Sequence, residues 1–526
     1  MTSLKPKIPE IPENERTPLV TTLLEVLSWQ QKQIEELEKQ ILKLKSETTK
    51  PDIKPSNMDE KTAQGDEGQD DSKEKKGPKR KKTAQLPIHN TQIIEPDIIP
   101  EGSIFKNYRD VIVQDITIKL NNTCYRIAEY ETADGSYISG KLPSGIRDGH
   151  WGVDLQSFIL HQYHHQHVTQ PLLLEYLHDL DVDISSGQLS NLLTQKQDIF
   201  HDEKGEILTV AMAVSKVLHT DDTGARHAGK NGYCTHIGNE LFAWFSSTEA
   251  KSRINFLQCL SEGVERQYVI NDGALEYFAQ QKLPQTRLNN LDIDEGININ
   301  SQKIWEEWLT TQGITKERHR KIMTEGALIG GLLAQGISSE LVIMSDDAGQ
   351  FNVFDHVLCW IHAERLINRL IPLNEQHKKA VNWVREQIWG LYADIKSYKM
   401  NPDKKQAKEI RERFEEICRT KTCYQSLNLA LKRLGKNQSE LLRVLDKAWI
   451  PLHNNLSERD IRDYVKKRKI SGSTRSEAGR KCRDTFASLK KTCRKHKLSF
   501  WKYLHDRISR AEQIPLLSDL IRQAAT

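Results

Sequence analysis

Two apolar, β-branched runs that each end in a pair of acids constrain the fold of this chain most strongly. The run LTVAMAVSKVLHT stops at Asp221-Asp222, and the run ELVIMS stops at Asp346-Asp347. A further run, ELFAWFSSTE, lies between them and indicates another strand. Buried strands with polar carboxyl ends are typical of an α/β sheet, whose ligands gather at those ends. The sequence therefore predicts a multidomain α/β protein with acids at one edge of a sheet.

A third acid, Glu458, lies in HNNLSERDIRDYVKKRK, in the first turn of a predicted helix. We select Asp221 and Asp346 from their pairs because each directly follows its apolar run. The local alternative for Glu458 is a capping box, in which Asn455 caps the helix and Glu458 lies three residues later. Each acid taken alone could also be an ordinary solvated surface charge.

Taken together, the three acids point to metal-assisted chemistry. Magnesium prefers a few carboxylate oxygens and keeps several waters. Two metal ions held by shared carboxylates stabilise the attacking and the leaving oxygens of a phosphoryl displacement. We therefore predict that Asp221, Asp346 and Glu458 are catalytic and bind Mg²⁺, two ions per site, with Mn²⁺ as a possible substitute.

Basic charge is concentrated directly after Glu458. Between Arg459 and Arg510 the chain carries 18 Lys and Arg against 5 Asp and Glu, although its net charge is only +4. Such a surface suits a polyanion, and phosphate contacts would position DNA without reading its sequence. The alternative is a solvated helix face. The predicted DNA-contacting residues are Arg459, Arg462, Lys466, Lys467, Arg468 and Lys469.

The region before the α/β pattern divides into four segments. Apolar residues at heptad spacing over 20–44 predict a coiled coil and a homo-oligomer, with a single docked amphipathic helix as the alternative. The polar sequence from 46 to about 92 predicts a disordered tether. Alternating residues over 104–142 predict a small β module. Three predicted helices then suit a helix-turn-helix or a helical spacer, and Gln188 on the last helix is a candidate DNA contact.

The remaining patterns limit the cofactors and the location. The pattern between Leu366 and Leu445 is entirely helical and predicts an insertion within the α/β domain. Eight scattered cysteines without a CxxC pair predict reduced thiols and no zinc site, and the histidines of 161–167 are read as a polar helix surface. No apolar run is long enough to span a membrane and no secretory signal is recognisable, so we expect a cytoplasmic protein.

The motifs DDTGARH, SDDAGQFN, CWIHAER, HNNLSERDIR, RKISGSTRSEAGR and SLKKTCRKH together resemble the DDE transposases of bacterial insertion-sequence family sixty-six. The resemblance covers the chain from about Gly149 to Asp506. It implies a ribonuclease-H-like fold that cuts and joins DNA at transposon ends, with water and then a DNA 3′-hydroxyl as nucleophiles. The matching acids are Asp221, Asp346 and Glu458.

The same resemblance implies further properties. His362 matches the histidine of a CxxH element and could orient the scissile phosphate. Accessory transposition proteins are implied as partners beside the transposon ends and the target DNA, and a nucleoid-associated location follows. Relatives often carry a CxxC zinc segment that this chain lacks, and it reads His453-Asn454-Asn455 where many relatives read Asp-Asn-Asn.

The predicted organisation has six parts: a coiled coil at 1–48, a disordered linker at 49–100, a small β module at 101–148, a helix-turn-helix at 149–200, a ribonuclease-H-like catalytic domain at 205–365 and 450–526, and a helical insertion at 366–449. Two other functions remain open at this point. One is a non-catalytic DNA-binding regulator derived from a transposase, and the other is a ribonuclease-H-like nuclease that cuts without joining.

Overall fold

The computed structural model describes residues 87–262, 266–288 and 297–525, together with the single positions 17, 20 and 27. The chain divides into two units, Met1–Gln69 and Asp70–Thr526, and every element named below belongs to the second. The predicted coiled coil at 20–44 lies outside the described residues apart from two positions, as does the predicted linker up to residue 86. Both stay predictions.

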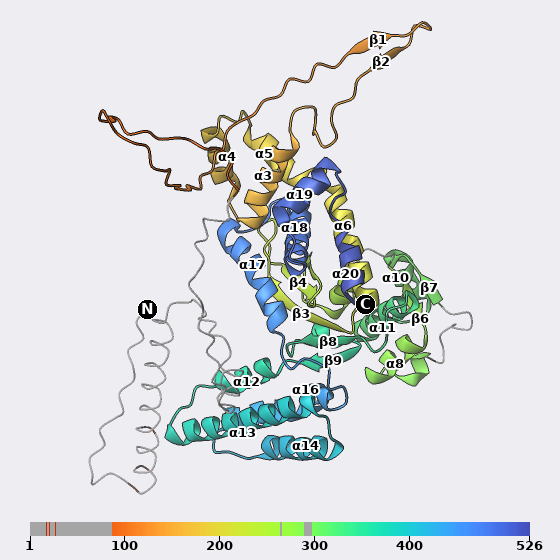
Figure 1. Ribbon diagram of the computed structural model, residues 1–526. Helices are drawn as coiled ribbons and strands as arrows, with labels where there is room; N and C mark the ends of the chain where they lie inside the picture. Colours follow the sequence, from red (N-terminus) through yellow and green to blue (C-terminus); the bar gives the residue numbers. More distant parts are fainter. Residues whose placement is uncertain are drawn as a thin grey trace. The chain divides into compact units, whose positions relative to one another are not determined.

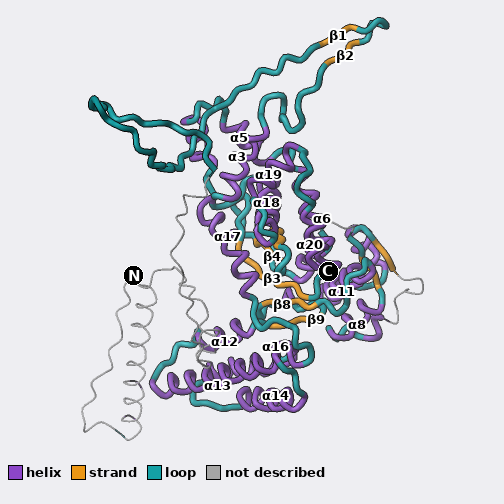
Figure 2. Tube along the Cα trace, viewed as in Figure 1, coloured by secondary structure: helices purple, strands orange, loops and turns teal. Residues whose placement is uncertain are grey.

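Between residues 87 and 152 the only helix or strand is a short β-hairpin (Figure 2). Strands β1 (Glu129–Glu131) and β2 (Tyr137–Ser139) are antiparallel, and Gly135 turns between them with a φ of +80°. The strands predicted over 104–120 do not form. Val113 is 81% exposed there, because no neighbouring strand or apolar face covers it, and strands need such partners to be stable. The predicted β module is reduced to the hairpin.

Helices follow the hairpin segment: α3 (Val153–Leu160), the π-helix η3 (His161–His165), α4 (Gln170–Asp179), α5 (Ser186–Thr194) and α6 (Asp198–Val214). Ser185 caps α5 in a capping box: its hydroxyl accepts from the Gln188 amide at 3.2 Å, and the Gln188 side chain accepts from the Ser185 amide at 2.8 Å. The groove-binding role of α5 stays a prediction.

Helix α6 corrects one reading of the sequence. The letters LTVAMAV, read as the start of a strand, form its last two turns, and the strand begins only at Val217. Leu208, Ala211 and Met212 are buried on one face of the helix. This spacing follows the helical repeat and not the alternation of a strand.

A five-stranded mixed sheet forms the centre of this unit (Figure 1). Its strands are β3 (Val217–Gly224), β4 (Tyr233–Gly238), β5 (Ala243–Thr248), β8 (Val342–Ser345) and β9 (Asp355–Leu358), in the order β5-β4-β3-β8-β9. The pairs β5/β4 and β4/β3 are antiparallel, whereas β3/β8 and β8/β9 are parallel. The mixed α/β class predicted from the sequence is confirmed.

The edge strand β5 is covered by helix α18 (Glu477–Lys495). Three side chains one helical turn apart accept from alternate amides of the strand. Asp484 accepts from Ser247 at 2.7 Å, Ser488 from Phe245 at 2.9 Å, and Thr492 from Ala243 at 3.2 Å. An exposed edge would otherwise present unpaired amides to another chain.

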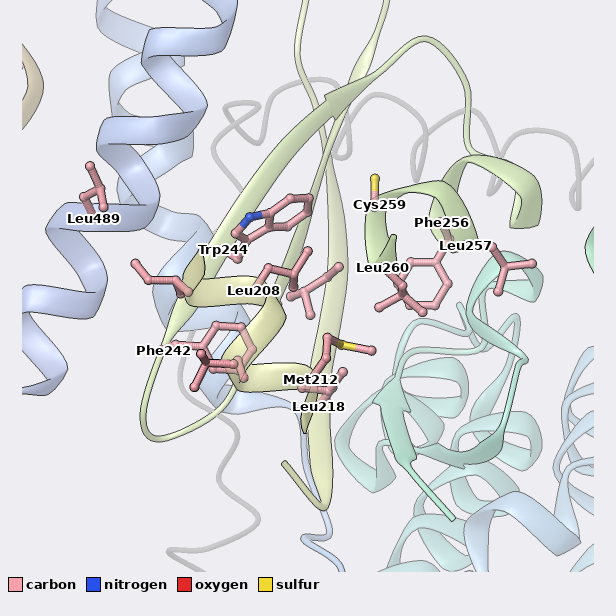
Figure 3. Close-up of a cluster of buried hydrophobic side chains, with 14 of the residues drawn as sticks. Leu208, Met212, Leu218, Phe242, Trp244, Phe256, Leu257, Cys259, Leu260 and Leu489 are labelled. Carbon is pink, nitrogen blue, oxygen red and sulfur yellow. The ribbon is translucent and has the colours of Figure 1, made fainter. Parts of the chain in front are cut away.

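The main core lies where α6, α7 (Arg253–Leu260) and α18 meet the sheet (Figure 3). Leu208 of α6, Leu218 of β3 and Trp244 of β5 are fully buried in it. Burial of a side chain of this size contributes roughly 1.5–3 kcal/mol. This core holds β3 in the middle of the sheet.

A second α/β layer lies between β5 and β8 in sequence: α7, β6 (Tyr268–Ile270), α8 (Asp272–Gln280), α9 (Gln285–Leu288), β7 (Ile297–Ile299), α10 (Gln302–Thr311) and α11 (Glu317–Ala334). Strands β6 and β7 pair antiparallel, and α11 packs on β6. A Cβ at Gly330 would lie 2.1 Å from the Val269 carbonyl oxygen. Gly330 therefore allows α11 to pack closely against β6.

Helices occupy the chain between β9 and the C-terminal helices: α12 (Trp360–Asn368), α13 (Glu375–Met400), α14 (Lys404–Arg419), α15 (Gln425–Lys436), α16 (Gln438–Leu441) and the 3-10 turn η5 (Arg443–Leu445). Asn374 and Asp403 cap α13 and α14 through their side chains. The C-terminal helices are α17 (Asn455–Ser471), α18, α19 (Phe500–Ser509) and α20 (Leu517–Ala525). The predicted domain boundaries stay predictions.

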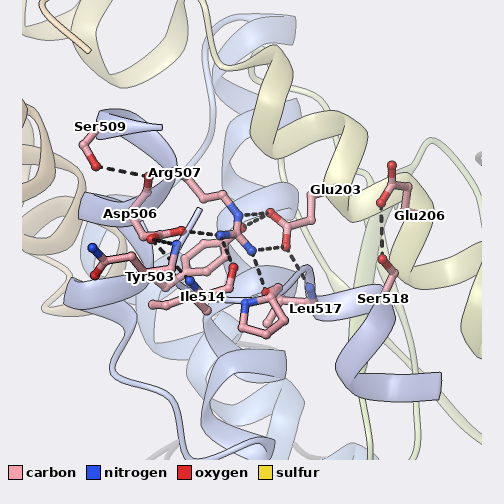
Figure 4. A network of polar contacts seen from close by, with 11 residues as sticks. Glu203, Glu206, Tyr503, Asp506, Arg507, Ser509, Ile514, Leu517 and Ser518 are labelled. Carbon is pink, nitrogen blue, oxygen red and sulfur yellow. Dashed lines mark hydrogen bonds and ion pairs between the residues drawn. The ribbon is translucent and has the colours of Figure 1, made fainter. Parts of the chain in front are cut away.

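A buried ion pair joins α6 to α19 (Figure 4). The Arg507 guanidinium donates to both oxygens of Glu203, at 2.9 and 3.0 Å. Glu203 also accepts from the Tyr503 hydroxyl at 2.7 Å and the Leu517 amide at 3.0 Å, so all these bonds reach C-terminal helices.

Among the described residues, no helix is long and apolar enough to cross a membrane.

Candidate active site

Asp221 and Asp346 lie on the two neighbouring parallel strands at the middle of the sheet. The β3/β8 pairing runs from Val217–Val342 to His219–Met344, and Asp346 directly follows β8. Asp221 does not follow its strand as predicted but lies within β3, because pairing with the antiparallel β4 extends β3 to Gly224. Both carboxylates are therefore just beyond the end of the parallel pairing, at one edge of the sheet.

The pKa of Asp221 is raised by its burial and by nearby acids. Burial raises this pKa most, and the negative charge of Asp346 adds to it, followed by smaller effects of Asp222 and Glu458. The Asp222 amide donates to Asp221 at 2.7 Å and lowers the pKa in part, leaving it at about 7. Acids that are distant in sequence thus act on one carboxyl group.

Asp222 and Asp347, which are adjacent in sequence to the two selected acids, have other partners. Asp222 accepts from the Thr235 hydroxyl at 2.6 Å and from the Gln350 amide at 2.8 Å, so its carboxylate is held by neutral donors. Asp347 is exposed and forms an ion pair with Arg433 of α15 at 2.5 Å. The Asp346 carboxylate, by contrast, accepts only from the Ala348 amide, at 3.1 Å, among the bonds of the described chain.

Glu458 lies in the first turn of α17, and its carboxylate reaches across to α12. The Arg365 guanidinium donates to it at 2.8 Å, and the Nε2 atom of His362 is 3.6 Å from the same oxygen. The capping box considered from the sequence is not formed. The helix begins one residue earlier than predicted, with Asn454 at its N-cap. The Glu458 carboxylate accepts from Arg365 instead of capping the helix.

Asn454 anchors this end of α17 and makes no side-chain cap because its amide group is already bonded. Its oxygen lies 2.9 Å from the His219 ring, and its nitrogen donates to the Thr220 carbonyl at 2.7 Å. Its backbone amide donates to the Cys359 sulfur at 3.2 Å. One fully buried residue thus links α17 to β3 and to the start of α12, and so fixes where Glu458 emerges.

The basic residues predicted to contact DNA differ in exposure. The exposed ones on α17 are Arg459, Arg462, Lys466 and Lys469. Arg468 is half-buried and donates to the Thr223 hydroxyl at 3.0 Å. Lys467 is buried and donates to the Tyr163 carbonyl at 2.8 Å. Gln188 is exposed on α5, but its side chain is engaged in the capping box.

Two comparisons with known proteins bear on this arrangement. Residues 315–482 match the family described as Transposase IS66 family. A Sinorhizobium fredii protein named "Uncharacterized protein y4jO" is 40% identical over 304 residues, which are 57% of this chain and 94% of that protein. The chain belongs to the IS66 transposase family. The resemblance stated from the sequence motifs is thereby confirmed.

The IS66 family match covers part of the candidate site. It contains Asp346, His362 and Glu458 and begins after Asp221. Within the described part of this IS66-family chain, no three Asp, Glu, His or Cys side chains are grouped closely enough to hold a metal ion. Cys359 is buried, and burial raises the pKa of its thiol to about 11. This disfavours the thiolate form that binds metal ions.

Sequence reasoning missed two residues of this IS66-family site. Arg365 lies one turn after His362 in CWIHAER, and that spacing places both on one helix face, which was a usable signal. Asn454 precedes the residue chosen as the helix cap. Its contacts to β3 join segments more than two hundred residues apart, and no local pattern in the sequence indicates them.

Proposed function

We propose that this IS66-family chain is a DNA transposase that cleaves and joins DNA at the ends of its element, and that Asp221, Asp346 and Glu458 are its catalytic acids. The observation that carries the proposal is the position of Asp221 and Asp346 just beyond the end of the parallel β3/β8 pairing, and the charges of Asp346 and Glu458 both raise the pKa of Asp221. We further propose that the five-stranded sheet is the core of a ribonuclease-H-like domain.

The donor set fits divalent metal ions in chemistry. Mg²⁺ takes carboxylate oxygens, and Asp221 and Asp346 each accept only one backbone hydrogen bond among the described contacts. Their mutual repulsion is the kind that a bound cation relieves. Glu458 would complete the set by exchanging Arg365 for the metal. When bound, two Mg²⁺ ions, or Mn²⁺ in their place, would activate the nucleophile and stabilise the departing 3′-oxygen.

The chain's own residues have distinct proposed roles. Asp221 holds a proton for part of the time near neutral pH and must release it to act as a ligand. Arg365 and His362 hold Glu458 in the metal-free protein, and His362 then faces the scissile phosphate. The exposed Arg459 and Arg462 lie on the helix that carries Glu458, where their positive charge suits the DNA backbone.

The wider proposal has three further parts. We propose that α5 contacts the transposon ends through a helix-turn-helix, that the segment 20–44 assembles protomers as a coiled coil, and that accessory proteins take part. Exposure of Gln188 and the cap of α5 at Ser185 support the first part. The heptad spacing supports the second. Family membership supports the third.

The test is magnesium-dependent cleavage of DNA that carries the element's own ends. We expect Asp221→Asn, Asp346→Asn and Glu458→Gln each to abolish cleavage while DNA binding persists, because the metal ligands are lost and the basic helix is kept. Asp347→Asn is the matched control, since Asp347 is next to Asp346 but pairs with Arg433. Cleavage by any of the first three variants at the wild-type rate would refute the assignment.

The same assay separates the alternatives. A non-catalytic regulator would bind the ends and never cut them, even with accessory proteins added. A nuclease would cut and produce no strand-joined product. The repulsion that Asp346 and Glu458 exert on Asp221 favours an enzyme over a regulator, because a protein that only binds DNA has no need of acids that raise one another's pKa.

A further inference from the structure

A second concentration of charge lies away from the candidate active site, in a cavity of about 20 Å³ between η3, α17 and α18. Lys467, Arg483 and Lys490 line it, together with His164, and all four side chains are buried. His167, on the same lining, is only partly buried, so the cavity opens on one side. A space of this size holds one water-sized group.

The two carboxylates that line the cavity already have cationic partners. Asp463 pairs with Lys491 at 2.7 Å. Asp460 pairs with Lys495 at 2.9 Å, and Lys491 lies 3.8 Å from it. Asp463 also raises the pKa of Lys490, but burial has the larger effect, and neither acid forms an ion pair with Lys467, Lys490 or Arg483 among the described contacts.

Lys467 and Lys490 point at main-chain oxygens of the neighbouring helical segment. Lys467 donates to the Tyr163 carbonyl at 2.8 Å and lies 3.4 Å from the centre of the Tyr163 ring. Lys490 donates to the His164 carbonyl at 3.4 Å. Within the described ranges, neither ammonium group lies within 4.0 Å of a carboxylate, although both are buried.

Two further side-chain nitrogen atoms at the cavity have no hydrogen-bond partner. The Nε2 atom of His164 is buried without a hydrogen bond, and the Nε atom of Arg483 also makes none, although the Asp484 carboxylate lies 3.8 Å from it. Their side chains are 7% exposed, so solvent cannot satisfy them freely. A buried polar group without a partner is rare and usually indicates a missing water or ion.

The electrostatics agree with the geometry. Burial lowers the pKa of Lys467 to about 7, with further repulsion from Lys490 and Arg483. Burial also lowers the pKa of Lys490, to about 8. Cations that are held together in a poorly solvated space favour a bound anion, because the anion offsets both burial and mutual repulsion.

We propose that this cavity binds one phosphate oxygen of a DNA backbone. A cavity of about 20 Å³ has room for an oxygen and not for a base. Exposed Lys466 and Arg494, which both act on the pKa of Lys490, provide positive charge nearby. π-helices such as η3 are rare and frequently mark functional sites. That the phosphate belongs to DNA rests on the proposed function, whereas the anion site itself does not.

The experiment compares the full-length wild type with Lys490→Met in two measurements. The first is the shift in thermal midpoint on adding inorganic phosphate at constant ionic strength. The second is the salt dependence of DNA binding. We expect phosphate to stabilise the wild type and not the variant, and the log–log salt slope to fall by about one phosphate contact, or roughly 0.9, in the variant. Lys408→Met is the matched control and should change neither, because Lys408 is exposed on α14.

The outcomes separate cleanly. If inorganic phosphate does not stabilise the wild type and the salt slope of Lys490→Met is unchanged, the site is refuted. If phosphate stabilises the wild type but the slope is unchanged, the site takes free anions and its assignment to DNA is wrong. Lys490→Gln serves if the methionine variant does not fold. Asp221→Asn should show the same stabilisation by phosphate and the same salt slope as the wild type. This test is therefore independent of whether the proposed catalysis is correct.

Discussion

Asp221 and Asp222 are neighbours in one strand and yet have different surroundings, because successive strand side chains point to opposite faces. Asp221 is acted on by Asp346 and Glu458, whereas Asp222 accepts from Thr235 and Gln350. The sequence selects Asp221 within the pair from strand position alone, although β3 continues past both acids to Gly224. The hydrogen bonds of Asp222 supply a physical reason for the same choice.

At the same scale, Arg365 should compete with metal for Glu458. We expect Arg365→Met to lower the Mg²⁺ concentration for half-maximal binding about three- to tenfold, since a partly exposed ion pair worth about 1 kcal/mol no longer has to be broken. Thermal stabilisation by Mg²⁺ measures this without catalysis. In the Glu458→Gln background, Arg365→Met should no longer change the Mg²⁺ concentration for half-maximal binding. Weaker Mg²⁺ binding in Arg365→Met would show that the arginine supports the metal-bound form.

Lys467 should make stability depend on pH. Its folded pKa of about 7 is below the ordinary lysine value of about 10.4, so the folded protein binds this proton less strongly than the unfolded chain. The resulting destabilisation is complete below pH 7 and disappears as pH rises towards the unfolded value. Lys467→Met should therefore raise the free energy of unfolding at pH 6 and change it little at pH 10, in urea titrations without phosphate.

The control for that measurement is Lys466→Met, because Lys466 is exposed on the same helix and pairs weakly with Asp463 at 3.7 Å. It should show no such pH trend. An equal stability change at both pH values in Lys467→Met would mean that packing, and not the charge, determines its effect.

Among the elements, those with a strong local pattern were predictable from the sequence. The strand ELFAWFSSTE corresponds to β5, and the amphipathic spacing after Leu366 corresponds to α13, α14 and α15. LTVAMAV was misread because a short apolar run fits both a strand and a buried helix face. Strand order, the cover of β5 by α18 and the Asn454 contacts depend on residues far apart in sequence, which no local pattern encodes.

The junction of α6 with α19 and α20 should be sensitive to a single charge. Glu203→Ala leaves the buried Arg507 guanidinium with Asp506 as its remaining carboxylate partner and leaves the Tyr503 hydroxyl and Leu517 amide unpaired. We expect a loss of about 3 kcal/mol in the free energy of unfolding. Asp519→Ala breaks an exposed pair with Arg522 on α20 and should cost less than about 1 kcal/mol. If urea titrations gave similar small losses of unfolding free energy for both variants, the Glu203–Arg507 pair would not stabilise this junction.

For the described unit as a whole, segments differ in how much they contribute to stability. Most large apolar side chains between Ile88 and Leu142 are exposed, in contrast to the buried core around the sheet. Packing to the body begins at Ser144 and Gly145. The Ser144 hydroxyl donates to the Ser509 carbonyl at 2.8 Å, and a Cβ at Gly145 would lie 2.5 Å from the Ile508 carbonyl oxygen.

Replacing residues 104–140 by a short Gly-Ser linker should therefore change the free energy of unfolding by less than about 0.5 kcal/mol, as expected for surface positions. The same deletion should reduce concentration-dependent association, because exposed apolar patches promote it. Calorimetry and light scattering measure the two effects. Gly145→Ala, a far smaller change, should destabilise by more than about 1 kcal/mol because the residue has a φ of +83° and no room for a methyl group. If the deletion destabilised the protein more than Gly145→Ala, the apolar side chains of 104–140 would have to be packed, and the boundary at Ser144 would be wrong.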